Sequence, residues 1–169
     1  MPAAPRSPAD SSEPIADRTV VIRRVIAAPA RLLFLAYTTP EHVMKWFGPP
    51  GYPLTLCEMD FRVGGRYRFA MTGPDGRQNT PFGGTYLAIE PNAKIAYDNR
   101  FEEDGAETMV MTTTFHESDG RTTLTLETVF GSVAMRNLHV GSGFEQGTGA
   151  AFDQLAQTVA DMGRPPSAP

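Results

Sequence analysis

Alternating apolar and polar residues dominate the middle of the chain, and this pattern predicts antiparallel β-strands. It is clearest in the segment 60–77 (DFRVGGRYRFAMTGPDGR), where Tyr67, Phe69 and Met71 alternate with two arginines and an alanine. One face of this strand is apolar and the other is basic, as expected for a strand that covers a core or a cavity. Gly64 and Gly65 precede it and permit a bend or a positive φ angle, because neither carries a Cβ atom.

Turn residues divide the alternating region into consecutive strands. Gly-Gly, Pro-Asp-Gly, Pro-Asn and Ser-Asp-Gly are typical of tight turns, and a run rich in valine and isoleucine before them adds a first strand. The predicted strands span residues 18–27, 54–61, 66–72, 80–90, 94–101, 107–116 and 121–130.

Helix signals lie on both sides of the strand region. Two short helices are predicted at 29–37 and 40–47, because Pro29 and Pro40 stand at first-turn positions, where a missing N–H costs nothing. A long helix is predicted at 143–162, where apolar residues recur every three or four positions. Its first turns contain Gly147 and Gly149, which each cost about 1 kcal/mol of helix stability relative to alanine. Close packing or a ligand-facing surface would explain why glycine stands there.

This order of elements predicts an α+β fold in a single domain over residues 18–163. The 169 residues are enough for one domain with a substantial core. Residues 1–17 are rich in proline, alanine and serine, and they are predicted to form a disordered tail, as is the short segment 164–169.

Composition narrows the partners and the compartment. A net charge of -4 and an isoelectric point near 5.3 argue against binding to nucleic acid, which requires a concentrated basic surface. No run of eighteen apolar residues is present, so no membrane partner is expected. Cys57 is the only cysteine and no signal-peptide apolar core precedes it, which together predict a cytoplasmic protein.

The motifs, taken in order, resemble one known family. They are PARLLFLAYTTPEHVMKWFGPPGY, DFRVGGRYRFAMTGPDG, GGTYLAIEPNAKIAY and GFEQGTGAAFDQLAQTV. Together they resemble the branch of the START/SRPBCC (Bet v 1-like) superfamily named after the activator of heat-shock protein 90 ATPase. The resemblance implies a helix-grip fold, in which a bent antiparallel sheet of about seven strands wraps around a long carboxy-terminal helix and encloses a hydrophobic cavity.

Two departures from the branch affect the expected function. Members commonly have Gly-Trp at the start of the last helix, whereas this chain has Gly143 and Phe144, which removes an indole N–H donor. The co-chaperones that name the branch carry a further large amino-terminal domain, so a chaperone partner is not expected here.

Apolar residues on the predicted inner faces are the candidates for a cavity lining. Methionine suits a tolerant ligand site because its side chain adapts to irregular shapes, and tyrosine adds a hydroxyl that needs a partner when buried. The candidate ligand-binding residues are Trp46, Phe47, Tyr67, Phe69, Met71, Tyr97, Met109, Met111, Phe115, Leu124, Leu126, His139, Phe144 and Phe152. For any one of them, plain core packing is the competing interpretation.

Other candidate chemistry is sparse. His139 is a possible general base if it faces the cavity, while His42 and His116 are expected to face solvent. The spacing of the histidines fits no metal motif, and neither a metal nor a cofactor is predicted. Glu58 and Asp60 share a strand face, but Arg62 follows them and indicates an exposed row of charges.

Three functions therefore stay open from the sequence. The leading hypothesis is binding of a small hydrophobic molecule, with the physiological role undefined. The first alternative is a cofactor-free enzyme, similar to a cyclase or hydrolase, that uses His139 or Tyr67 on an aromatic or polyketide-like substrate. The second is a stress protein that activates a chaperone ATPase. A homodimer through a strand edge or helix face is also possible.

Overall fold

The computed structural model describes residues 7–164 and contains one antiparallel sheet of seven strands in the order β1-β7-β6-β5-β4-β3-β2. Each strand pairs with its sheet neighbours in antiparallel register, so β1 and β2 form the two edges. The strands are β1 (Thr19–Ile26), β2 (Leu54–Met59), β3 (Arg66–Met71), β4 (Phe82–Glu90), β5 (Lys94–Phe101), β6 (Met109–Ser118) and β7 (Arg121–Val129).

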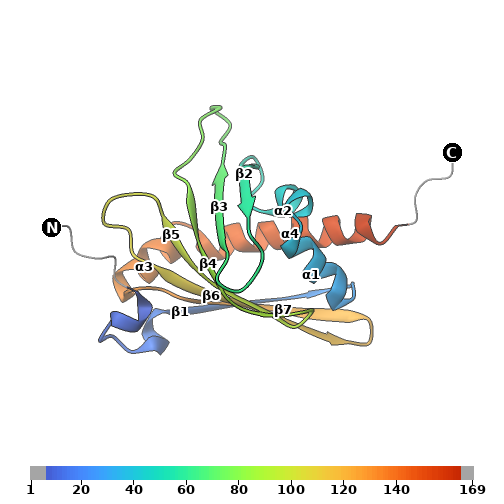
Figure 1. Ribbon diagram of the computed structural model, residues 1–169, viewed down its shortest axis with the longest axis horizontal. Coiled ribbons are helices and arrows are strands. Elements are labelled where there is room, and N and C mark those ends of the chain that lie inside the picture. Colours follow the sequence, from blue (N-terminus) through green and yellow to red (C-terminus); the bar gives the residue numbers. More distant parts are fainter. Residues whose placement is uncertain (1–6, 165–169) are drawn as a thin grey trace.

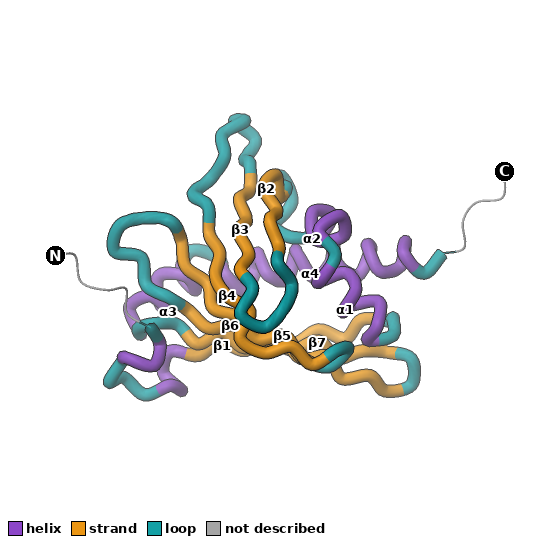
Figure 2. The backbone as a smooth tube through the Cα atoms, in the orientation of Figure 1, coloured by secondary structure: helices purple, strands orange, loops and turns teal. Residues whose placement is uncertain are grey.

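Four α-helices accompany the sheet. They are α1 (Ala30–Thr38), α2 (Pro40–Trp46), α3 (Val133–Gly141) and α4 (Phe144–Met162). Figure 1 shows β1 and β7 running close to the direction of α4, whereas β2 and β3 turn upward across it, so the sheet is strongly curved around the helix. In Figure 2 the loop between β3 and β4 (72–81) extends furthest from the helices. This is the helix-grip fold that the sequence predicts.

The main hydrophobic core lies between the sheet and the helices α1, α2 and α4. Phe152, Leu155 and Val159 of α4 are buried, as the three-to-four spacing predicts. Leu33 of α1 is also fully buried, and the indole Nε1 of Trp46 donates a hydrogen bond to the carbonyl oxygen of Ala36 at 3.0 Å. The two short helices are thereby fixed to each other at one end of the sheet.

Glycine permits the close approach of strands in β4. A Cβ atom added to Gly83 would lie 2.1 Å from the carbonyl oxygen of Tyr67, and one added to Gly84 would lie 2.1 Å from that of Asp98. Such distances are impossible for a real side chain, so β3 and β5 approach β4 only because these positions lack Cβ. Gly64 and Gly65 instead form the predicted turn between β2 and β3, with Gly64 at a φ of +83°.

The sequence does not predict α3, which occupies residues 133–141. Ser132 caps this helix, because its hydroxyl accepts a hydrogen bond from the backbone N–H of Met135 at 3.0 Å. The helix that follows the cap has only nine residues, so its apolar positions repeat too few times to give a clear helical pattern in the sequence. The missed helix matters because it carries His139.

The amino-terminal segment is more structured than expected. Residues 1–17 are predicted to be a disordered tail, whereas the structure has 3-10 helices at η1 (Pro8–Asp10) and η2 (Ile15–Arg18). The carboxylate of Glu13 accepts a hydrogen bond from the backbone N–H of Val133 at 2.6 Å, at the start of α3. Arg18 is buried and donates to the carbonyl oxygen of Phe130 at 2.9 Å. The predicted tails at 1–6 and 165–169 lie outside the described residues.

Candidate ligand-binding cavity

A cavity of about 330 Å³ lies between the inner face of the sheet and the amino-terminal half of α4. Side chains from α1, α2, α3 and strands β3 to β7 complete its wall, so nearly every element contributes. Aromatic rings make up much of this wall, and aspartate, glutamate, lysine and arginine are absent from it in the part of the chain that the structure describes. The cavity is therefore apolar and carries no fixed charge.

The structure brings most of the predicted cavity residues together. Phe115 and Leu124 are buried in the hydrophobic core and do not belong to the cavity wall. All the other candidates line the cavity: Trp46, Phe47, Tyr67, Phe69, Met71, Tyr97, Met109, Met111, Leu126, His139, Phe144 and Phe152.

Several wall residues were not predicted. Phe82 and Tyr86 lie on the same face of β4 as Gly84, at every second position, so the alternation of this strand could have identified them as wall residues. Three further wall residues come from unrelated places in the sequence: Tyr37 from the end of α1, Phe61 from the turn after β2, and Phe101 from the end of β5. Only the tertiary fold brings them together.

The rings of the wall contact one another in a continuous set. Phe47 packs against Phe69 and Phe82, with ring centroids 5.3 Å and 5.9 Å apart. Tyr37 packs against Trp46 at 4.7 Å. These offset and edge-on arrangements are the favoured geometries of aromatic pairs, and they give the wall a defined shape.

Gly147 keeps one side of the cavity open. It lies on the wall in α4, and a Cβ atom added there would meet no other residue within 4 Å. This arrangement matches the ligand-facing explanation for glycine in the first turns of the helix. Two turns further along the same face of α4, Gln154 donates from Nε2 to the carbonyl oxygen of Gly48 at 2.6 Å and holds the loop after α2 against the helix.

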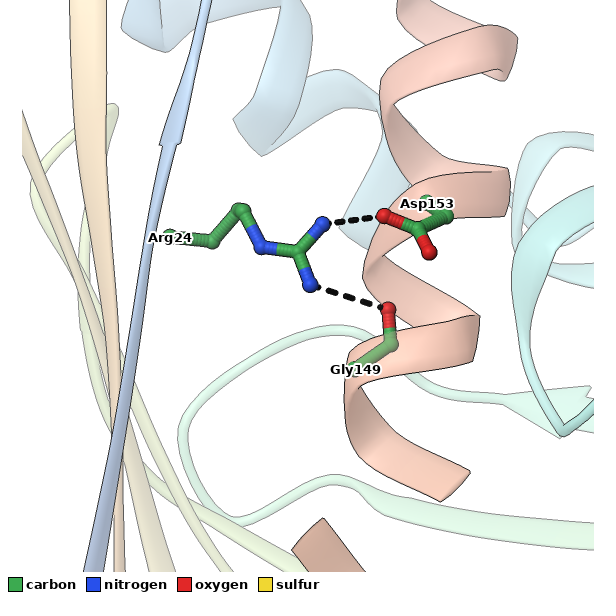
Figure 3. Close-up of polar contacts among 3 residues, drawn as sticks. All are labelled: Arg24, Gly149 and Asp153. Carbon is green, nitrogen blue, oxygen red and sulfur yellow. Dashed lines mark hydrogen bonds and ion pairs between the residues drawn. The ribbon is translucent and has the colours of Figure 1, made fainter. Parts of the chain in front are cut away.

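Arg24 connects the edge strand β1 to α4 (Figure 3). Its guanidinium forms an ion pair with Asp153 and also donates from Nη2 to the carbonyl oxygen of Gly149 at 3.2 Å. A Cβ atom added at Gly149 would lie 3.5 Å from this nitrogen, which is an ordinary van der Waals distance, so the contact with Arg24 does not require glycine at this position. The arginine thus links the edge strand to the first half of α4, in addition to the buried apolar residues that hold the helix on the sheet.

Tyr67 is the wall tyrosine with well-formed hydrogen bonds. Its hydroxyl lies 2.8 Å from the carbonyl oxygen of Asp98, to which it donates, and 2.8 Å from Oδ1 of Asn99. Burial, followed by the neighbouring Tyr97, raises the pKa of Tyr67 well above the ordinary range. The hydroxyl therefore stays protonated, and it is not available as a base at neutral pH.

His139 is enclosed by aromatic rings. Its ring centroid lies 5.2 Å from that of Phe130, 6.3 Å from Phe101 and 6.2 Å from Phe144. Burial lowers the pKa of the imidazole below 6.5, so the ring is neutral at neutral pH. No carboxylate is hydrogen-bonded to it within residues 7–164, so the orienting partner that a general base requires does not accompany it.

The other chemically active residues lie outside the cavity. Burial raises the pKa of the Cys57 thiol to about 11, which keeps it protonated and unreactive at neutral pH. Asp60 pairs with Arg62 at 2.9 Å on the surface, as the row of charges indicates. His116 is exposed, whereas His42 is only partly exposed and its Nδ1 is buried, which differs from the expectation that it faces solvent.

A wider hollow of about 870 Å³ lies outside the aromatic cavity and differs from it in character. Its wall combines acidic residues with Arg66, Arg68 and Arg100, and the Arg68 guanidinium contacts the Glu102 carboxylate at 2.6 Å and 3.0 Å. We consider the smaller cavity the candidate site, because enclosed apolar walls favour binding more than an open surface of paired charges. No group of three or more possible metal ligands occurs in the described part of the chain.

A curved antiparallel sheet that holds a long terminal helix over an aromatic cavity defines the helix-grip class. Residues 27–160 match the family described as "Activator of Hsp90 ATPase homolog 1-like protein". The chain belongs to this family, within the START/SRPBCC superfamily. Among curated proteins, none matches the chain.

Solved bacterial structures share the fold. A Rhodobacter sphaeroides protein aligns with a TM-score of 0.80 at 22% identity, over 90% of this chain and 99% of that one. A Mycobacterium smegmatis protein gives 0.77 at 25%, over 89% and 96%. A Chromobacterium violaceum protein gives 0.70 at 27%, over 84% and 97%. None of the described helices is long and apolar enough to cross a membrane.

Proposed function

We propose that this protein binds a small hydrophobic molecule in the cavity between the sheet and α4. The carrying observation is the cavity itself, about 330 Å³ of space with aromatic walls inside an otherwise packed fold. Protein interiors are normally filled to high density, whereas this partly open cavity leaves aromatic side chains without packing partners on one side. Its volume and apolar character fall within the range of small-molecule sites. The single cysteine, Cys57, favours the cytoplasm as the place of binding.

The two alternative functions have weaker support. The enzyme hypothesis needs an activated His139 or Tyr67, but the first lacks an orienting partner among the described residues and the second holds its proton. The chaperone hypothesis rests on the family name alone, and that name refers to the co-chaperone after which the family is called. Binding requires only the shape and polarity of the wall, and we therefore prefer it.

Gly147→Leu tests the proposal by filling the cavity from inside. Nothing lies within 4 Å of a Cβ atom added at this position of the cavity wall, so the first carbon of the leucine meets open space and the rest of the side chain takes up room that a ligand would use. Helix propensity should also stabilise the unliganded variant by about 1 kcal/mol. Gln146→Leu is the matched control, since the neighbouring residue is exposed and lies outside the cavity wall.

The measurement is native mass spectrometry of gently purified protein, followed by solvent extraction and a thermal-shift screen of lipophilic compounds. We expect wild type and Gln146→Leu to retain or accept a lipophile and to melt at higher temperature with it. Gly147→Leu should lose both effects. Equal retention by all three proteins would refute the cavity as the binding site.

A further inference from the structure

One part of the cavity wall is polar but has no internal partner. Tyr37 of α1 and Tyr97 of β5 lie there, and Thr113 of β6, which is not itself a wall residue, lies beside both phenols; we call the three the hydroxyl cluster. The sheet register explains part of the convergence: Ile95 is paired with Thr113, and Tyr97 lies two positions further along the same face of β5. Side chains in this diagonal arrangement reach one another across neighbouring strands.

The hydroxyl cluster combines one buried hydroxyl without a partner, that of Thr113, with two phenols on the cavity wall. Thr113 is fully buried, and its Oγ1 makes no hydrogen bond with any described residue. The Thr113 hydroxyl lies beside the phenols of Tyr37 and Tyr97 and lowers the pKa of both, although burial raises the two pKa values by more. The contact between Thr113 and the phenols does not have the geometry of a formed hydrogen bond. Tyr67, by contrast, is already bonded to Asp98 and Asn99.

A buried hydroxyl without a partner, such as that of Thr113, is costly, and native proteins rarely keep one without a reason. Tyr37 and Tyr97 line the cavity, so a polar atom of a bound molecule would reach their hydroxyls. Burial raises the pKa of Tyr97 to about 12 and that of Tyr37 well above the ordinary range, so both phenols remain hydrogen-bond donors at neutral pH. The acceptors near Tyr67 are already used by its own hydroxyl, so Tyr37 and Tyr97 are the phenols that a ligand oxygen would serve as acceptor.

The charge of the wall restricts the partner further. A carboxylate placed in the cavity would lose its hydration and find no arginine or lysine on the described wall to compensate it. His139 would not compensate it either, because its imidazole is neutral. The dense aromatic lining favours a flat ring system that stacks on it.

We infer that the cavity takes an uncharged aromatic molecule with a carbonyl or hydroxyl oxygen, and that this oxygen accepts hydrogen bonds from Tyr37 and Tyr97. The inference rests on the proposed function and adds the chemical class of the ligand. It separates the site from one for fatty acids, whose charged head group has no partner in this wall.

Three naphthalenes of similar size test the inference. They are 2-acetylnaphthalene, which carries an oxygen acceptor, 2-ethylnaphthalene, which lacks it, and naphthalene-2-carboxylate, which is charged. Isothermal titration calorimetry at pH 7 should show the ketone binding about three- to tenfold more tightly than the ethyl compound, as expected for a neutral hydrogen bond. The carboxylate should bind most weakly.

The double variant Tyr37→Phe, Tyr97→Phe should remove the preference for the ketone and leave affinity for 2-ethylnaphthalene unchanged or improved. Its melting temperature should not fall, because the lost hydroxyls have no well-formed bonds within the described fold. Tyr52→Phe is the control, since this tyrosine is exposed and lies outside the cavity wall. If the hydroxyl cluster had only a structural role, the double variant would instead melt at a lower temperature and would bind both 2-acetylnaphthalene and 2-ethylnaphthalene more weakly.

The outcomes separate the two levels of the proposal. If a lipophile is extracted from the protein but the ketone shows no advantage, or the double variant keeps it, the hydroxyl cluster is not the polar subsite. Tightest binding of the carboxylate would likewise overturn the inference. If wild type binds none of the three compounds and yields no extracted molecule, the proposed function fails, and the ligand class fails with it.

Discussion

Burial controls the ionisation of side chains in and around the cavity. It raises the pKa of the wall tyrosines and of Cys57, and it lowers the pKa of His139. Every one of these shifts favours the neutral form, because a charged group loses hydration when it is enclosed. At the scale of the residue, the protein therefore presents shape and hydrogen bonds to a ligand rather than charge.

Cys57 allows this effect to be measured directly. Its pKa of about 11, against 9.0 for a free thiol, should reduce the thiolate fraction at pH 8 about 100-fold. Alkylation by iodoacetamide should be slower than in the urea-unfolded chain by about this factor, because the thiolate is the nucleophile. The corresponding stability is fully present below the unfolded pKa and is lost as pH rises toward 11. Equal alkylation rates in folded and unfolded protein would contradict the shift.

Sequence patterns locate the cavity residues but not their partners. Alternation places Tyr67, Phe69 and Met71 on one face, and the structure puts all three in the wall. The same alternation also selects Phe115, which the fold assigns to the core instead. Whether an apolar residue meets another side chain or an empty space depends on curvature and on distant elements, and a local pattern does not encode either.

At the scale of the element, the strands, the two short helices α1 and α2 and the long helix α4 were predictable from the sequence, whereas α3 was not. The predicted strand 94–101 coincides with β5, because turn residues bound it on both sides, at 91–92 and at 102–105. The α3 helix was not predicted, because its only start signal is the N-cap residue Ser132 and its nine residues mix apolar and polar side chains without a clear helical period. The contact between Arg24 and Asp153 was also invisible in the sequence, since 129 positions separate the two residues.

The link between β1 and α4 has a predictable strength. Asp153 keeps most of its side-chain surface exposed, so solvent screens its charge and the ion pair is weak. We expect a double-mutant cycle with Arg24→Met and Asp153→Asn to give a coupling of about 0.2–1 kcal/mol in urea unfolding, reduced at high salt. Arg24→Met should cost more than Asp153→Asn, because it also removes the bond to the Gly149 carbonyl. Equal single costs would argue against that second contact.

At the scale of the whole molecule, the cavity gives the folded protein excess volume. Pressure favours the state of smaller volume, and the volume change of unfolding scales with the internal space that is lost. Unliganded wild type should therefore show a more negative volume change than Gly147→Leu, with Gln146→Leu resembling wild type. Pressure unfolding followed by the fluorescence of Trp46, the only tryptophan, measures it. Identical volume changes in the three proteins would mean that the leucine does not occupy the cavity.

The pairing of the first strand with the last also governs how the chain folds. Thr19 of β1 is paired with Val129 of β7, and Glu13 caps a helix that begins at Val133. During synthesis, β1 therefore has no sheet partner until more than a hundred further residues have left the ribosome. Contacts between such distant positions make folding slow, and an unpaired apolar strand is prone to aggregate in the meantime. The grip on α4 is completed only after this helix has been synthesised, so the nascent protein cannot hold a ligand before residues 144–162 have left the ribosome.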